Sequence, residues 1–212
     1  TRALVDDALE RYEFSLANEN LYKFAWGEFC DWYLEIAKVQ IPRDWGSATE
    51  EEYARGVNTQ VVLGRVLDAV LRLLHPAMPF VTETLWTALT KDVEGYPESL
   101  VIAEWPDQSM TNNGAEPDEL AARRMADLEK LVTELRRFRA DQGVKPKQRV
   151  PGRLDFAAVD LAEEEAAIRS LARLEEPGDD WETTASIELR LSQATITVEL
   201  DTSDAVDIEA ER

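Results

Sequence analysis

The sequence predicts a mainly α-helical protein, in which a helix bundle is followed by a small unit of α-β-α-β-β order. Three observations predict this. Apolar residues recur at helical spacing up to about residue 90, turn-forming residues crowd the next segment, and apolar and polar residues alternate near the end of the chain. We therefore expect a helical domain at 1–117, with segment 92–117 docked on it, and a small α/β domain at 118–212.

The first two helices are predicted from the spacing of apolar residues. In residues 2–19 and again in residues 20–39, apolar side chains recur at steps of three and four, as they do on one face of a helix. The inward stripe of the second helix is predicted to consist of Tyr22, Trp26, Phe29, Tyr33 and Ile36.

Capping residues and prolines indicate the ends of the next two helices. Thr49 can accept a hydrogen bond from the first turn of a helix, and the three glutamates that follow it suit the positive end of the helix dipole. This helix should run to about Leu74. Pro76 cannot continue the hydrogen-bond ladder, whereas Pro79 suits the first turn of a short helix that ends near Thr90. A sharp corner between the two helices is therefore expected.

The segment at 92–117 contains several turn-forming residues, among them Gly95 and Pro106. Its apolar run, "LVIAEW" at 100–105, is predicted to dock on the bundle as a strand. The boundary between the two domains is expected at the end of this segment.

The second domain is predicted to begin with a helix at 118–141 and to continue with a strand at 149–156. A helix at 160–175 follows. Apolar residues then alternate with polar ones on both sides of "SQAT", which is typical of a hairpin within 187–200.

Charge is distributed unevenly along the chain. The 212 residues include 23 Lys and Arg against 43 Asp and Glu, a net charge of −20, so the overall field repels phosphate and anionic membranes. Between Arg123 and Arg153, however, ten basic residues stand against four acidic ones, a local charge of +6. A nucleic-acid partner would have to be contacted in this segment, or by short-range interactions elsewhere.

Cysteine content and hydropathy indicate where the protein is expected. Cys30 is the single cysteine and cannot form an internal disulfide, which fits a reducing compartment. No apolar run approaches the ~20 residues that are needed to cross a bilayer, and the start of the chain lacks the pattern of a signal peptide. We expect a cytoplasmic location and no membrane partner.

The sequence shows no catalytic centre. A Cys30 nucleophile would need a nearby base, and the single histidine, His75, precedes a proline at a helix end. One Cys and one His cannot supply the ligands of a zinc site, and neither common Gly-rich phosphate loop is present. We therefore expect no catalytic residue, cofactor or metal in this chain. A hydrolase that uses Cys30 is a disfavoured alternative.

Some residues of the basic segment are expected to pair with acids on one helix face. Three pairs of opposite charge lie four residues apart, which suits a solvated ladder worth roughly 0.2–0.5 kcal/mol per pair. They are Arg123–Asp127, Lys130–Glu134 and Arg137–Asp141. Other cations cross from the helix into a strand with few acids among them, which suits a phosphate backbone. The predicted phosphate-contacting residues are Arg136, Arg139, Lys145, Lys147 and Arg149.

Aromatic side chains at helical spacing, such as Trp26 and Phe29, are expected in the core. Rings that stack on bases must be exposed, and Phe24 and Trp32 are better candidates because they lie off the inward stripe. Packing against neighbouring helices is the alternative for both.

Several stretches resemble a known family. "YEFSLANENLYKFAWGEFCDWYLEIAK" at 12–38 resembles the anticodon-binding helix bundle of valyl-tRNA synthetases. "LRLLHPAMPFVTETLW" at 71–86 is similar to a corner of the class I synthetases for valine, isoleucine and leucine, although Ala77 stands where a bulkier residue is expected. "ELRRFRADQGVKPKQRVPGRL" at 134–154 and "VELDTSDAVDIEAER" at 198–212 are similar to later segments of the same enzymes.

The resemblance implies a tRNA-binding part of a bacterial valine–tRNA ligase, with the anticodon stem-loop of tRNA(Val) as its partner. In the family, nucleotide-binding and editing domains come earlier in the chain, and the enzyme activates valine with ATP and Mg²⁺ and then transfers it to tRNA. The small α/β domain would lead toward a C-terminal coiled-coil arm that this sequence does not reach. The alternative from another class is an acidic helical module that binds proteins and no RNA.

Overall fold

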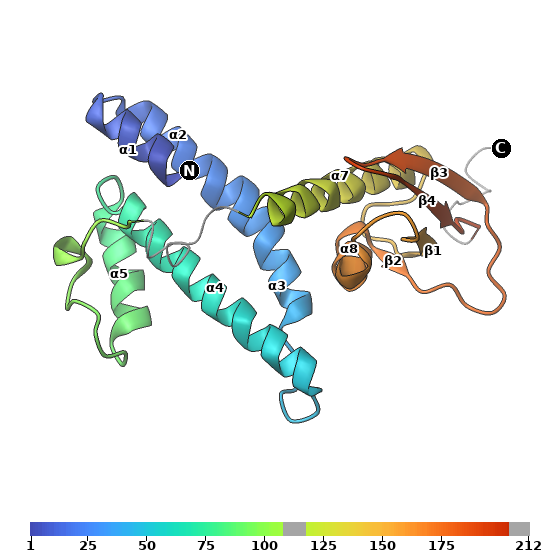
Figure 1. Cartoon of the computed structure of the whole chain (residues 1–212), viewed down its shortest axis with the longest axis horizontal. Helices are drawn as coiled ribbons and strands as arrows, with labels where there is room; N and C mark the ends of the chain where they lie inside the picture. The colour runs from blue at the N-terminus through green and yellow to red at the C-terminus, as the bar shows by residue number, and fades with distance from the viewer. Residues whose placement is uncertain (108–117, 204–212) are drawn as a thin grey trace. The chain divides into compact units, whose positions relative to one another are not determined.

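Figure 1 shows the computed structural model of the chain, in which residues 1–107 and 118–203 are described. Two compact units follow each other along the chain, Thr1–Pro117 and Asp118–Arg212. The first is helical, and the second combines helices with a four-stranded sheet. The predicted fold class, a helix bundle followed by a small α/β unit, is confirmed. The end of the predicted docked segment and the last nine residues of the family resemblance lie outside the described residues.

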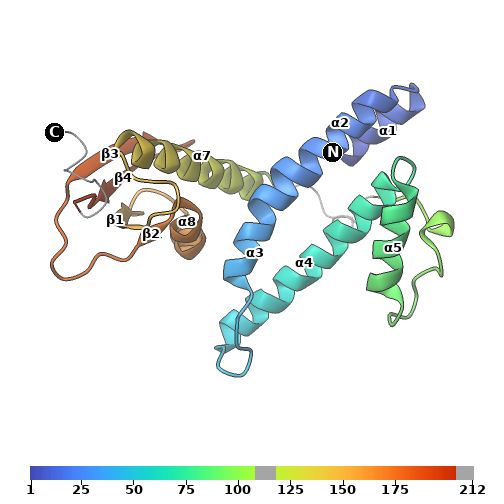
Figure 2. The same ribbon diagram turned by 180° about the vertical axis from the view of Figure 1, so that it is seen from behind.

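The first unit is built from helices. Its elements are α1 (Arg2–Glu10), α2 (Phe14–Tyr22), the π-helix η1 (Lys23–Tyr33), α3 (Leu34–Gln40), α4 (Glu50–Leu74), α5 (Pro79–Thr90) and the 3₁₀ turn η2 (Leu100–Ile102). Figures 1 and 2 show α1 beside α2, and α2, η1 and α3 as one continuous helical stretch. A buried cluster joins α1, α2 and the end of α4; it consists of Val5, Ala8, Ala17, Leu21 and Leu73.

The predicted helix at 2–19 is broken at Tyr12. This residue has a φ of 60°, in the left-handed region that non-glycine residues rarely adopt. The amides of Tyr12 and Glu13 donate to the carbonyls of Leu9 at 3.0 Å and Ala8 at 2.8 Å, which closes the end of α1. The apolar spacing continues through this turn because α1 and α2 contribute to the same core. Periodicity alone therefore could not show the break.

The π-helix changes which aromatic side chains face the core. Tyr22 and Trp26, both predicted to lie inward, are 63% and 59% exposed, whereas Phe29 and Ile36 of the same predicted stripe are buried. A π-helix bonds each carbonyl to the amide five residues later, so its turns hold more residues than those of an α-helix. The α-helical stripe therefore does not stay on one face along η1, and the prediction is wrong for its first two members.

Helix α4 begins where its sequence predicts. Thr49 Oγ1 accepts a hydrogen bond from the Glu52 amide at 3.2 Å, and the Glu52 carboxylate accepts one from the Thr49 amide at 2.8 Å. These reciprocal bonds form a capping box. The corner at the other end is also confirmed, since α4 ends before Pro76 and Pro79 occupies the first turn of α5.

The segment after α5 docks through a 3₁₀ turn and not through a strand. The Glu83 carboxylate accepts a hydrogen bond from the Leu100 amide at 3.1 Å, and Leu100 packs in a buried cluster with Leu71 and Trp86. Within the described part of the first unit there is no strand to which this segment could pair. The predicted strand is therefore wrong, although the predicted docking of its apolar residues is correct for Leu100.

The second unit combines two longer helices with a mixed sheet. Its elements are α7 (Glu119–Asp141), β1 (Val150–Asp155), the 3₁₀ turn η3 (Ala162–Glu164), α8 (Glu165–Ala172), β2 (Leu174–Glu175), β3 (Ala185–Arg190) and β4 (Thr195–Leu200). The strand order is β2-β1-β4-β3, with β1 and β2 parallel and the other neighbours antiparallel. The apolar core is formed by α7, α8 and the sheet; its fully buried members include Leu131, Leu135, Ile168, Ile196 and Val198.

The predicted helix at 160–175 is shorter than its sequence suggests. Helix α8 ends at Ala172, and Arg173 follows in the left-handed conformation, with φ 53° and ψ 49°. Leu174 then begins β2, which pairs in parallel with β1. A strand of two residues carries no periodic signal, so the sequence could not predict it. The Val150 amide donates to the Arg173 carbonyl at 3.4 Å, which holds the end of α8 beside β1.

Candidate nucleic-acid interface

The predicted phosphate-contacting residues lie at the end of α7 and in the loop that leads to β1. Gly143, with a φ of 75°, lies just beyond the helix end, where a left-handed glycine is common. The Val144 amide donates to the Arg139 carbonyl at 3.0 Å and closes the last turn. We call residues 142–149 the basic loop, because it carries the exposed side chains of Lys145, Lys147 and Arg149.

Arg139 lies beneath the basic loop and not on its surface. The residue is 4% exposed, and its guanidinium donates to the carbonyl oxygen of Gln148 across the loop. Its Nε has no hydrogen-bond partner among the described residues. Arg139 therefore holds the basic loop to the end of α7 from the inside. The phosphate contact expected of Arg139 stays a prediction.

Other arginines gather around this buried guanidinium. The pKa of Arg139 is lowered, first because burial disfavours the charged form. The positive charges of Arg173, Arg136 and Arg149 lower it further. Arg173 follows α8 and was not among the predicted residues, because it is distant in sequence from the basic segment. The fold thus brings together three of the predicted cations and one that the sequence did not indicate.

Arg136 and Arg149 are exposed, and each donates to a carbonyl near the end of α8. Arg136 Nε lies 3.0 Å from the Leu171 carbonyl oxygen, and Arg149 Nη1 lies 3.3 Å from that of Leu174. The Leu171 carbonyl belongs to the last turn of α8, where carbonyls lack partners within the helix and carry partial negative charge, so a cation is favourable there. A guanidinium has five N–H donors, so this contact uses only part of what Arg149 can offer to a ligand.

The ion-pair ladder predicted on α7 is wrong for its first pair. The Asp127 carboxylate accepts hydrogen bonds from the amide and the hydroxyl of Ser192, at 2.8 and 2.5 Å, in the turn between β3 and β4. Arg124, which was not a member of the ladder, pairs with Glu164 at 2.8 Å. Residues on other elements supply these partners, and spacing along one helix cannot reveal them.

Arg153, on β1, is engaged within its own sheet. It pairs with Glu199 of β4 at 3.8 Å, and its guanidinium lies 4.7 Å from the centre of the Trp181 ring. Arg153 is therefore partly neutralised by an acid of its own sheet.

Exposed aromatic rings of the first unit form a second candidate surface. The rings of Tyr22 and Trp26 stack with their planes 5° apart and their centres 6.0 Å apart. Phe24 and Trp32, the two rings that the sequence favoured, are only partly exposed. Unpaired bases stack on exposed rings of this kind. The sequence missed the pair because its exposure follows from the π-helix, which no local composition marks.

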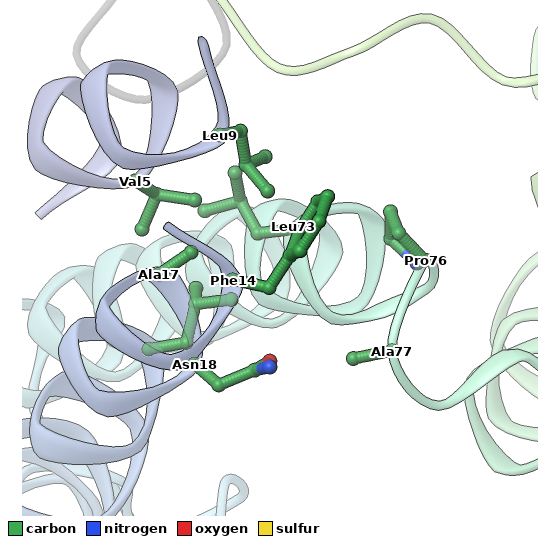
Figure 3. A pocket seen from close by; sticks show the side chains of 9 residues that line it. Val5, Leu9, Phe14, Ala17, Asn18, Leu73, Pro76 and Ala77 are labelled. Atoms are coloured by element: carbon green, nitrogen blue, oxygen red, sulfur yellow. The ribbon is translucent and has the colours of Figure 1, made fainter. Parts of the chain in front are cut away.

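An apolar pocket of about 240 Å³ lies between α1, α2 and the corner after α4 (Figure 3). In Figure 3 the side chains of Val5, Leu9 and Leu73 line it on one side, and the amide of Asn18 points toward Ala77 on the other. Asn18 is the one polar side chain among its lining residues, so the pocket suits apolar groups and offers no cation to a phosphate.

His75 and Cys30, the two residues that the sequence analysis considered for catalysis, are part of the packing of the first unit. His75 Nδ1 lies 2.8 Å from Thr82 Oγ1, a contact that joins α4 to α5. Cys30 is partly buried in η1. Within the described ranges, no group of three or more His, Cys, Asp or Glu side chains could hold a metal ion. No described helix is both long and apolar enough to cross a membrane.

Comparison with known families identifies the fold. The family described as the anticodon-binding domain of tRNA ligase matches residues 1–154. This chain belongs to that family. The matched region includes the helical unit, α7 and the whole basic loop, and it ends within β1.

Relatives of this anticodon-binding domain match it along its full length. It is 74% identical over 211 residues to the valine–tRNA ligase of Corynebacterium jeikeium (strain K411), and 66% identical over 211 residues to that of Corynebacterium diphtheriae. It is 50% identical over 216 residues to the valine–tRNA ligase of Mycobacterium tuberculosis. Each alignment covers 100% of this chain, but the chain spans only 22–23% of the length of these relatives.

Proposed function

We propose that this chain binds the anticodon stem-loop of tRNA(Val) as part of a longer, cytoplasmic valine–tRNA ligase. The observation that carries the proposal is the family match over residues 1–154. The relatives support the choice of valine, since those named above are valine–tRNA ligases and are up to 74% identical to this chain.

The longer enzyme would activate valine with ATP and Mg²⁺ and then esterify it to tRNA(Val). That chemistry would belong to the nucleotide-binding domain, and proofreading to the editing domain, of the same polypeptide. The anticodon-binding chain would contribute affinity and tRNA identity, because a tRNA held at its anticodon places its distant acceptor end at the catalytic domain.

The basic loop supports phosphate contact by this chain. Lys145, Lys147 and Arg149 are exposed there and Arg136 is exposed on α7, while buried Arg139 holds the loop to α7. The net charge of −20 opposes RNA at long range. At 0.1 M salt, however, charges more than about 10 Å apart are largely screened, so a local group of cations can still bind phosphate. Guanidinium groups suit this task because their N–H donors match the geometry of phosphate oxygens.

The aromatic pair on η1 supports contact with unpaired bases. Anticodon bases are single-stranded, and sequence-tolerant stacking on a ring contributes about 1–3 kcal/mol per base. Tyr22 and Trp26 are exposed and already parallel to each other, so a base can extend the stack without rearrangement of the protein.

A titration of labelled tRNA tests the proposal. Fluorescence anisotropy would be measured with tRNA(Val), with the same tRNA carrying an altered anticodon, and with an unrelated tRNA, at several salt concentrations. We expect tRNA(Val) to bind most tightly. The variant Lys147→Ala/Arg149→Ala should reduce the salt slope by about two, since each phosphate contact contributes about one.

The matched control is Lys91→Ala/Arg190→Ala, which removes one exposed lysine and one exposed arginine from outside the basic loop. It changes the net charge by the same amount and should leave the slope nearly unchanged. Equal effects of the two double variants would remove the basic loop from the interface. Failure of the unaltered chain to bind any tRNA at low salt would overturn the proposed function and favour a protein-binding module.

A further inference from the structure

We propose that Arg139, Arg149 and Arg173 form a site for one phosphate group of the RNA backbone, with Arg139 as its buried positioning residue. The site lies where the end of α8 meets the basic loop. The inference rests on the proposed function and deepens it, because it adds Arg173, which neither the charge pattern nor the family resemblance indicated.

A buried donor without a partner is the first observation. Arg139 is 4% exposed, and its Nε–H finds no acceptor among the described residues. A buried polar group without a partner costs stability, and buried charges in proteins are as a rule paired. The ion pairs in the described part of this unit engage Arg124, Arg153 and Arg169 instead. Arg139 thus places positive charge beneath Arg149 and Arg173, and an anion bound by those two exposed arginines would balance it.

The conformation of Arg173 is the second observation. It occupies the left-handed position just after α8, with φ 53° and ψ 49°, where glycine is the ordinary residue. A non-glycine residue in this region carries backbone strain. The exposed side chain of Arg173 makes no hydrogen bond or ion pair with the described residues that would offset this strain. Binding of an anion gives the side chain a role that glycine could not fill.

Repulsion among the arginines is the third observation. The pKa of Arg139 is lowered by burial and then by the charges of Arg173, Arg136 and Arg149. Like charges held this close favour an anion among them, because it reduces the repulsion and accepts charge-assisted hydrogen bonds.

Backbone contacts make the site rigid before any ligand binds. The guanidinium of Arg139 is held by the Gln148 carbonyl, and that of Arg149 by the Leu174 carbonyl at 3.3 Å. The Val150 amide, at the start of β1, donates to the Arg173 carbonyl and fixes the backbone of the third arginine beside this strand. A phosphate therefore meets donors that are already in place, which lowers the entropic cost of binding.

The test is a salt titration of tRNA(Val) binding by the 212-residue chain and three variants. Arg173→Gln removes an exposed cation that holds no core contact. Each phosphate contact contributes about 0.7–0.9 to the slope of log affinity against log salt concentration. A variant that lacks one contact should therefore gain about five- to eightfold less affinity than the unaltered chain when the salt is lowered from 1 M to 0.1 M. We expect losses of this size from Arg173→Gln. Arg190→Gln, on the exposed side of β3, is the control and should change neither affinity nor slope.

The double variant Arg139→Gln/Arg173→Gln distinguishes one shared phosphate from two separate contacts. Because both side chains serve the same phosphate, the slope of the double variant should fall by the same 0.7–0.9 and no further. A structural loss at Arg139 is measured separately, by urea unfolding of the double variant beside Arg173→Gln. A fall by about twice that amount would overturn the shared site.

The unaltered chain separates this inference from the proposed function. If it binds tRNA(Val) and Arg173→Gln matches it in affinity and slope, the phosphate site is wrong while the proposed function stands. If the unaltered chain binds no tRNA, both are overturned.

Discussion

The guanidinium of Arg139 donates to the carbonyl oxygen of Gln148, nine positions later and on the far side of the basic loop. This contact ties the last turn of α7 to the start of β1, so the shape of the loop depends on a side chain inside it. In the sequence Arg139 and Lys147 belong to one basic stretch. In the structure one lies inside and the other outside, and they have different physical roles.

Replacement of Arg139 by alanine should destabilise the second unit. The Gln148 carbonyl would lose the charged donor that Arg139 supplies, and a hydrogen bond to a charged group contributes about 1.5–3 kcal/mol. Native-state hydrogen exchange of the amides in β1 and β4 would measure this loss for the second unit by itself. Arg137→Ala is the control, since Arg137 is exposed on the same helix and should stay within about 0.5 kcal/mol of the unaltered chain. Equal protection in both variants would show that the contact between Arg139 and Gln148 contributes nothing.

Replacement of Trp26 by alanine should weaken tRNA binding without unfolding the first unit. Loss of one stacked base costs about 1–3 kcal/mol of binding free energy. Because Trp26 is 59% exposed, the free energy of unfolding should change little. Phe29→Ala is the contrasting variant: its ring is 8% exposed, so its removal should cost about 3–5 kcal/mol of stability. Anisotropy titrations would measure tRNA binding by both variants, and urea unfolding would measure their stability. Unchanged tRNA affinity in Trp26→Ala would show that this ring does not contact the tRNA.

The capping box of α4 should contribute to stability in a pH-dependent way. The pKa of Glu52 is lowered below its ordinary value of 4.5, first by the hydrogen bond from the Thr49 amide and then by that from the Thr49 hydroxyl. A lowered pKa means that the folded chain favours the charged carboxylate. The stabilisation is therefore fully present above pH 4.5 and is lost as the pH falls through the lower pKa of the folded state.

Glu52→Gln tests the direction of this effect. The variant should be less stable than the unaltered chain at neutral pH, and the difference should shrink as the pH falls below 4.5. Urea midpoints measured across this range would check it. Glu50→Gln is the control, because Glu50 lies in the same first turn but is not the capping-box residue. A difference that grows toward low pH would contradict the assigned sign.

The sequence predicted those parts of the fold that depend on neighbouring residues. The N-cap at Thr49, the helix start at Pro79 and the hairpin around "SQAT" follow from local chemistry, and all three are present. The turn at Tyr12 and the π-helical winding of η1 have no such local signal. Apolar spacing does not reveal a turn such as that at Tyr12 when the residues on both sides of it enter the same core.

The candidate site was predictable in its charge and not in its geometry. The excess of cations between α7 and β1 is visible in the sequence, and so is the family that carries it. Burial of Arg139 and the approach of Arg173 follow from the crossing of α7, α8 and β1, whose residues are distant in the chain. Spacing within one helix likewise predicted Arg123 as the partner of Asp127, whereas Ser192 of the β3–β4 turn takes that place.

A larger side chain at position 77 should stabilise the first unit. Ala77 lines the apolar pocket of about 240 Å³ beside Leu73 and Phe14, at a position where the related corner is expected to carry a bulkier residue. Ala77→Leu would cover apolar surface that is now in contact with water, and cavity-filling changes of this kind contribute about 0.5–2 kcal/mol. Ala8→Leu is the contrasting variant, since Ala8 is fully buried and a larger residue there should cost about 1–3 kcal/mol through overpacking. Thermal unfolding of the two variants should therefore shift in opposite directions, and a loss of stability in Ala77→Leu would show that the pocket cannot accept the added side chain.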